Sequence, residues 1–125
     1  MPNTTIGKTF TFEAAHQLPD YKGKCARLHG HSYKLSVSVS GEKQEDGPHK
    51  GMIIDLVVLS EIVHAEIIDK WDHQPLHEIL SFTTTVEMLA EEIFRLLDGK
   101  LPSGVVLEEV VLFETATCWA KTTRL

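Results

Sequence analysis

Residues 33–40 (YKLSVSVS) alternate strictly between apolar and polar side chains. Alternation with period two predicts a β-strand that has one face in the core and one in solvent. Residues 9–16 alternate more loosely, and they predict a preceding strand that ends at His16. The polar residues 41–51 contain glycine and proline, and we expect them to form a loop within one domain rather than a boundary between two.

Two helical segments are expected after this loop. Asp55 is a typical N-cap residue, and residues 56–70 carry apolar side chains at helical spacing. Thr84 and Glu87 have the spacing of a capping box, which predicts a second helix over residues 88–97.

Two more strands are expected at residues 105–114 and 117–124, the first of them apolar on both faces. The predicted fold class is therefore α+β: a four-stranded antiparallel sheet with two helices on one face, in the order ββααββ. Two helices can cover only one face, so the second apolar face of residues 105–113 needs another partner. A further copy of the chain would supply it, and we expect an oligomer.

Length and composition exclude several classes of protein. A chain of 125 residues has the size of one domain, and we expect a single domain over residues 1–125. A net charge of −6 argues against a general nucleic-acid or anionic-membrane binder. No apolar run approaches the ~18 residues of a membrane span, and the first twenty residues do not resemble a secretory signal. Two cysteines cannot form a disulfide framework, so we expect a reducing, cytoplasmic setting.

Three histidines are expected to converge at one end of the sheet. His29 and His31 are two residues apart and share the apolar face of their strand, and His16 ends the neighbouring strand. Three neutral imidazoles without a fourth protein ligand are typical of catalytic zinc, which keeps a position open for water or substrate. The alternative is that each is an ordinary surface or core histidine.

Cys25 lies four residues before His29, between Lys24 and Arg27. Nearby cations lower the pKa of a thiol, and a thiolate beside a metal-bound substrate can act as a general base or nucleophile. The alternative is a small buried apolar side chain, which is the usual role of a lone cysteine. Cys118 has no adjacent cation, and we interpret it as structural.

Two acidic positions are weaker candidates. Asp72 precedes His73, and a carboxylate beside an imidazole can fix its tautomer for proton transfer. Glu114 follows an apolar strand, where it is either a solvated strand end or an acceptor for the N–H edge of a ligand. Thr84, Thr85 and Glu87 have a sufficient explanation as helix-cap residues.

Taken together, these motifs resemble the 6-pyruvoyl-tetrahydropterin synthase superfamily over essentially the whole chain. Within it, the three-residue gap between Cys25 and the HGH sequence resembles the branch that forms 6-carboxytetrahydropterin in queuosine biosynthesis. The matching segments are FTFEAAHQL with His16, CARLHGHSY with Cys25, His29 and His31, GMIIDL with Asp55, WDHQPL with Asp72 and His73, TTTVEMLAEEI at the second helix, and ETATCWA with Glu114.

The resemblance implies a zinc-dependent carbon–carbon lyase with the tunnelling fold. Its expected substrate is 7,8-dihydroneopterin triphosphate, and its products are 6-carboxytetrahydropterin, acetaldehyde and triphosphate. The family assembles as a hexamer of two stacked trimers with active sites between subunits, so His73 is expected to serve a neighbouring chain.

The resemblance also implies roles for individual residues. His16, His29 and His31 hold the zinc, Cys25 removes a carbon-bound proton, and Asp72 with His73 relays protons. Glu114 anchors the pterin. Thr85 is a further candidate substrate contact. Lys24 and Arg27 are candidate contacts for the triphosphate because of their charge and position, not because of the resemblance.

Some positions depart from the family pattern. Trp71 replaces a leucine, His77 replaces an asparagine or aspartate, and residues 82–84 replace an Asn-Pro. Two alternatives remain at this point: a pyruvoyl-forming pterin synthase that uses the same residues, and a non-catalytic zinc- or pterin-binding protein with this fold.

Overall fold

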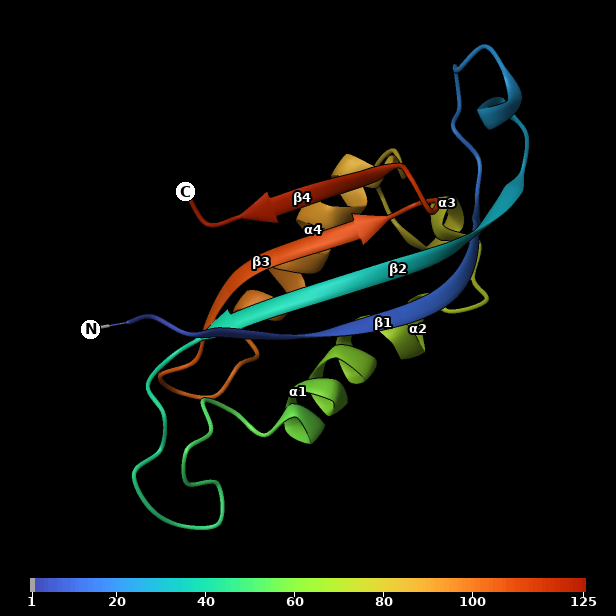
Figure 1. The fold of residues 1–125 in the computed structure, drawn as a ribbon. Helices are drawn as coiled ribbons and strands as arrows, with labels where there is room; N and C mark the ends of the chain where they lie inside the picture. The colour runs from blue at the N-terminus through green and yellow to red at the C-terminus, as the bar shows by residue number, and fades with distance from the viewer. Residues whose placement is uncertain (1) are drawn as a thin grey trace.

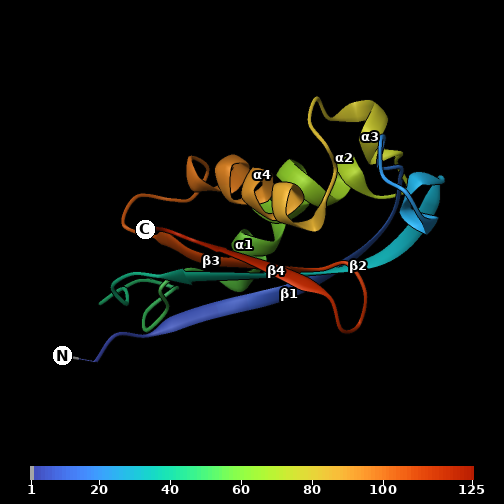
Figure 2. The ribbon, with the colours of Figure 1, turned by 90° about the horizontal axis from the view of Figure 1, so that it is seen from above.

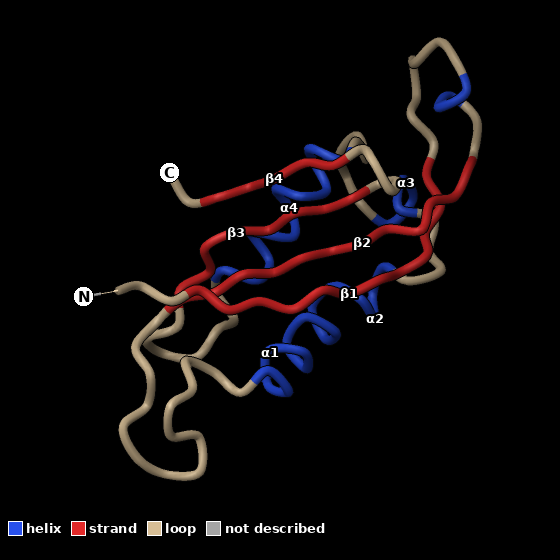
Figure 3. Tube along the Cα trace, viewed as in Figure 1, coloured by secondary structure: helices blue, strands red, loops and turns tan. Residues whose placement is uncertain are grey.

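A computed structural model describes residues 2–125, with all their side chains except that of Cys25. Four strands form one antiparallel sheet in the order β1-β2-β3-β4 (Figures 1 and 3), which confirms the predicted sheet. The strands are β1 (Thr5–His16), β2 (His29–Ser40), β3 (Val106–Phe113) and β4 (Trp119–Thr123). β1 and β2 each begin about four residues earlier than predicted, because the ladder between them continues through residues without strict alternation.

The helices lie on one face of this sheet, as Figure 2 shows. The first predicted helix is a continuous helical run made of α1 (Leu56–Val63), a π-helical turn η2 (His64–Ile68) and α2 (Asp69–Trp71). The second is α4 (Val86–Asp98). Two short segments were not predicted, the 3-10 turn η1 (Lys24–Ala26) and α3 (Leu76–Ile79), because three or four residues are too few to show a helical period. No helix in residues 2–125 has the length and apolar character needed to cross a membrane.

The helix starts show which side chains act as caps. The Asp55 carboxylate accepts a hydrogen bond from the Val57 amide at 2.9 Å, as expected. At the start of α4 the cap is Thr85, whose hydroxyl accepts from the Met88 amide at 3.2 Å. The prediction of Thr84 as the cap was therefore wrong by one residue. Thr84 is buried instead, next to His16.

The core lies between the sheet and the helices. On β1 and β2 the inward positions are buried apolar residues, and Phe12 stacks on Tyr33 with 5.0 Å between ring centroids. Trp71, at the end of the first helical run, meets the Phe12 ring edge-on at 6.2 Å. These three rings fill the part of the core that adjoins the histidine end of the sheet.

The opposite face of the sheet carries apolar side chains that no helix among residues 2–125 covers. A bulge at Glu108 shifts the β2–β3 register, and Leu107 and Val110 therefore both face the core although they are three residues apart. Beyond the bulge, Phe113 lies on the outer face, and its ring centroid is 6.3 Å from that of Trp119, which is 54% exposed. Part of the two-faced apolar pattern in β3 is thus explained by the bulge, and part by an uncovered outer face.

Candidate metal and pterin site

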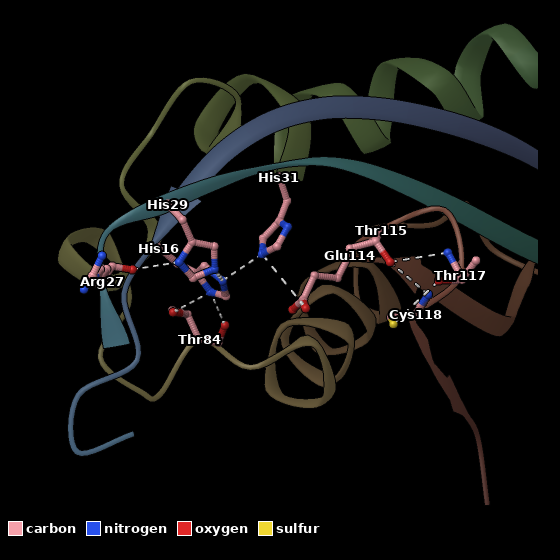
Figure 4. A network of polar contacts seen from close by, with 9 residues as sticks. All are labelled: His16, Arg27, His29, His31, Thr84, Glu114, Thr115, Thr117 and Cys118. Atoms are coloured by element: carbon pink, nitrogen blue, oxygen red, sulfur yellow. Dashed lines mark hydrogen bonds and ion pairs between the residues drawn. The ribbon is translucent and has the colours of Figure 1, made fainter. Parts of the chain in front are cut away.

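The β1–β2 hairpin brings the three histidines together. In its register His16 lies opposite His29, and Ala14 lies opposite His31. The Nε2 atoms of His16 and His29 are 2.9 Å apart, and those of His31 and His16 are 3.2 Å apart. Figure 4 shows the three rings pointing toward one another from the end of the hairpin.

Backbone carbonyls fix the orientation of two of these rings. His16 Nδ1 donates to the Thr84 carbonyl oxygen at 2.8 Å, and His29 Nδ1 donates to the Arg27 carbonyl oxygen at 2.7 Å. A carbonyl can only accept, so each Nδ1 carries the hydrogen and each neutral ring has its lone pair on Nε2. Metal-bound histidines typically have their second nitrogen held in this way.

Converging lone pairs repel one another unless a cation lies between them. One ligand atom from each of His16, His29 and His31 lies within 4.8 Å of the other two, and the group can hold a metal ion. The donor set, three neutral imidazoles, is one that suits zinc and several other transition metals.

Burial keeps the imidazoles of His16 and His31 in the neutral form that binds metals. His16 is 1% exposed, and burial lowers its pKa, although the hydrogen bond to Thr84 acts in the opposite direction. Burial also lowers the pKa of His31, and the charge of Glu114 opposes this shift. Both rings therefore stay neutral to lower pH than exposed histidines do.

Glu114 lies beside this cluster, just after β3. Its Oε1 is 3.9 Å from His31 Nε2. A tight turn holds its backbone: the Glu114 amide donates to the Cys118 carbonyl oxygen at 2.9 Å, and the Thr115 hydroxyl accepts from the Cys118 amide at 3.1 Å (Figure 4). Cys118 is free and exposed, and the structure gives it a place in this turn.

Asp72 and His73 form a pair on the edge of β1. The Asp72 Oδ1 accepts from the Glu13 amide at 2.9 Å and lies 3.0 Å from His73 Nδ1. The hydrogen bond from the Glu13 amide lowers the pKa of Asp72, and the contact with His73 acts in the same direction. His73 has a left-handed backbone, with φ at 60°, and its side chain is 76% exposed.

His73 also borders a hollow of about 420 Å³ at the end of the hairpin. The hollow reaches from His73 to His31. Other residues along its wall are Glu13, Leu28 and Ser32. His73 therefore borders the same hollow as one of the three histidines, but it lies outside the cluster itself.

The remaining candidates lie on the loop between β1 and β2 or at the start of α4. The Cys25 side chain lies outside the described residues, and its backbone belongs to η1, the turn that precedes His29. Lys24 and Arg27 are exposed on the same loop, and Arg27 contributes a backbone carbonyl to His29. The Thr85 hydroxyl caps α4.

Two residues at the site were missed by sequence reasoning. Thr84 was interpreted as a cap, yet its carbonyl oxygen orients His16. Tyr33 was interpreted as an ordinary inward residue, yet its buried hydroxyl has no hydrogen-bond partner among the described residues. Burial, with the charge of Glu114 in the same direction, raises the pKa of Tyr33, so it remains a donor. No sequence pattern signals either feature.

The buried histidines predict that the metal-free protein loses stability in acid. Well above the ordinary histidine pKa of 6.5, the rings of His16 and His31 are neutral in both the folded and the unfolded chain, and they have no effect. Below 6.5 the unfolded chain takes up protons first, because the pKa values of His16 and His31 are lowered in the folded state, so the free energy of unfolding falls. We expect the thermal midpoint of metal-free protein to drop between about pH 7.5 and 5.5.

The variant His31→Gln should make this drop smaller. The matched control is His64→Gln, which alters a more exposed ring and should leave the drop unchanged. Equal drops in all three proteins would show that the buried rings are not its cause.

Comparisons with known proteins agree with this geometry. The family model described as 6-pyruvoyl tetrahydropterin synthase matches residues 5–124. The chain is 33% identical to a 6-carboxy-5,6,7,8-tetrahydropterin synthase of Haemophilus influenzae, over 93% of this chain and 96% of that protein. It is 38% identical to a protein of the same name from Synechocystis, over 93% of this chain and 90% of the other.

A solved structure agrees as well. The 6-pyruvoyl tetrahydropterin synthase of Caenorhabditis elegans superposes with a TM-score of 0.84 at 29% identity, over 100% of this chain and 98% of that one. Sequence match, fold and the clustered histidines thus agree, and the chain belongs to the 6-pyruvoyl tetrahydropterin synthase family.

Proposed function

We propose that this protein is a 6-carboxy-5,6,7,8-tetrahydropterin synthase. With water, it would convert 7,8-dihydroneopterin triphosphate to 6-carboxytetrahydropterin, acetaldehyde and triphosphate, as a cytoplasmic step in queuosine biosynthesis. The observation that carries the proposal is the cluster of three neutral imidazoles beside Glu114, in a chain whose relatives over nearly their full length have this name.

The metal that we assign to His16, His29 and His31 is zinc. The fit rests on the donor set and on the two Nδ1–carbonyl bonds, which leave the Nε2 lone pairs of His16 and His29 facing each other. His31 Nε2 lies 3.2 Å from His16 Nε2 and supplies the third donor. When bound there, zinc supplies Lewis acidity to the hydroxyl groups of the substrate side chain.

The residues around the cluster have complementary roles in this proposal. Glu114 accepts hydrogen bonds from the amide and amino N–H groups of the pterin, and this places the pterin side chain over the histidines. Cys25, as thiolate, removes a carbon-bound proton. Lys24 and Arg27 are exposed on the loop where the triphosphate extends, and Thr85 borders the pterin from the start of α4.

His73 receives and returns protons, and Asp72 fixes its ring. The 3.0 Å contact between Asp72 Oδ1 and His73 Nδ1 supports this role, because it leaves Nε2 free to exchange a proton. The high exposure of His73 in a single chain is consistent with a site that a neighbouring subunit completes.

Two rival functions predict different products. A pyruvoyl-forming synthase would keep all three side-chain carbons, and a non-catalytic pterin-binding protein would leave the substrate unchanged. We expect purified protein with dihydroneopterin triphosphate to release one acetaldehyde per triphosphate and a product with the mass of 6-carboxytetrahydropterin. A product that retains the three carbons, or no turnover by the zinc-loaded protein, would contradict the proposal.

Zinc content is predicted to depend on the clustered histidines. His29→Ala should lose the metal, since two imidazoles seldom hold zinc at ordinary concentrations. His64→Ala is the matched control, because His64 lies in η2, away from the cluster, and it should keep one zinc per chain. Full zinc in the His29→Ala protein, measured by metal analysis, would refute the assignment.

Cys25 is predicted to affect turnover but not binding. Loss of a general base typically lowers turnover by ~10²-fold or more, and we expect this of Cys25→Ala with zinc content and pterin affinity retained. Cys118→Ala is the control and should turn over like the wild-type protein. If Cys25→Ala made the carboxy product at the wild-type rate, another group would have to take the proton, and His73 would be the next candidate.

We propose a homohexamer of two trimers as the working assembly. The outer face with Phe113 and Trp119 supports it, as do β4 and the part of β1 before Glu13, which each have one strand neighbour among the described residues. Open strand edges are places where another copy can pair. Sedimentation at micromolar concentration should show a species near six chains, and a monomer would contradict the assembly.

A further inference from the structure

Tyr33 has a buried polar atom that the proposed chemistry does not use. The residue is 0% exposed, and its hydroxyl is one of two buried side-chain polar atoms without a partner among the described residues. The other is Nδ1 of His77. Buried polar groups in native proteins are nearly always hydrogen-bonded, so each exception calls for an explanation.

The Tyr33 ring is held firmly beside the histidine cluster. It stacks on Phe12 at 5.0 Å between centroids, and it meets the rings of His31 at 5.5 Å and His16 at 6.5 Å edge-on. Packing on several sides fixes the ring, and therefore also the position of the hydroxyl at its tip.

The strand register places Glu114 opposite Tyr33. The last pair of the β2–β3 ladder is Lys34 with Phe113, and both side chains lie on the outer face, where the Lys34 Nζ is 4.5 Å from the Phe113 ring centroid. One step further along both chains, Tyr33 and Glu114 are cross-strand neighbours on the inner face. The 3.9 Å contact between Glu114 and His31 agrees with this direction.

The contact of Glu114 with His31 is one that a bound metal would change. Its carboxylate lies 3.9 Å from Nε2, which is the nitrogen assigned to the metal. Once that nitrogen is occupied, the carboxylate needs another group to hold it in place. The Tyr33 hydroxyl has no partner among the described residues, and it belongs to the residue that the register places opposite Glu114.

We propose that Tyr33 is a positioning residue for Glu114: in the pterin-bound protein its hydroxyl donates a hydrogen bond to one carboxylate oxygen, so that the carboxylate faces the 2-amino and ring N–H groups of the ligand. The inference rests on the proposed function, because it concerns how the pterin is recognised. Tyr33 acts through Glu114 and does not itself touch the pterin.

The test removes this one oxygen by Tyr33→Phe and compares two stable ligands, 6-carboxypterin and 6-carboxylumazine. The lumazine carries a carbonyl in place of the 2-amino group, so it cannot use the full carboxylate contact. We expect Tyr33→Phe to bind 6-carboxypterin about tenfold more weakly, the effect of losing one hydrogen bond to a charged group, with little change for 6-carboxylumazine. The preference for the pterin then falls by about tenfold.

The controls separate this role from simple packing. The chain has one other tyrosine, Tyr21, which is 54% exposed, and Tyr21→Phe should leave both affinities unchanged. The Tyr33→Phe protein should keep one zinc per chain and a thermal midpoint at least equal to that of the wild type, because it loses an unpaired buried hydroxyl.

Unchanged affinities in Tyr33→Phe would overturn the inference, and so would an equal loss for both ligands. Failure of the proposed function is distinguishable, because it shows in the wild-type protein as the absence of acetaldehyde release and of pterin binding. That result would remove the inference as well.

Discussion

The hydrogen bond from His16 Nδ1 to the Thr84 carbonyl oxygen joins the two halves of the molecule at the site. His16 ends β1, and Thr84 lies 68 residues later in the chain, two residues before α4. The bond therefore connects the sheet to the segment that leads into α4. It also decides which nitrogen of His16 carries the hydrogen. The same contact therefore positions α4 and prepares His16 Nε2 to bind a cation.

The site is built from strand ends, and this explains its combination of rigidity and access. His16 and His29 are the last and first residues of paired strands, and Glu114 follows Phe113 at the end of β3. At each of these residues, the sheet holds the chain in one direction, and a loop begins in the other direction. The loops carry Cys25 and His73, which the proposed reaction needs to move protons.

The sequence allowed the main elements to be predicted where periodicity was long. The alternation of residues 33–40 and the helical spacing of residues 56–70 gave the correct type of element, and the spacing of His16, His29 and His31 placed them at one end of the sheet. The cap of α4 was misplaced because Thr84 and Thr85 are both typical cap residues, and only the backbone geometry shows which of them fills that role.

Other features of the site could not be predicted, because they depend on contacts between distant backbone segments. The carbonyl groups of Thr84 and Arg27 have no side-chain signature, although they orient two of the three histidines. The position of Tyr33 beside Glu114 depends on the β2–β3 register, which residues 33–40 alone do not specify. The bulge at Glu108 could not be predicted either, because residues 105–113 show only that apolar side chains occur on both faces of the strand.

X-ray absorption at the zinc edge of the zinc-loaded protein tests the central claim most directly, because it counts the ligand atoms of the bound metal. The account predicts three imidazole nitrogens at about 2.0–2.1 Å with a light oxygen atom from solvent in the open position. A sulfur neighbour at about 2.3 Å would mean that Cys25 is a ligand rather than a base. A first shell with fewer than three imidazoles would contradict the assignment of His16, His29 and His31.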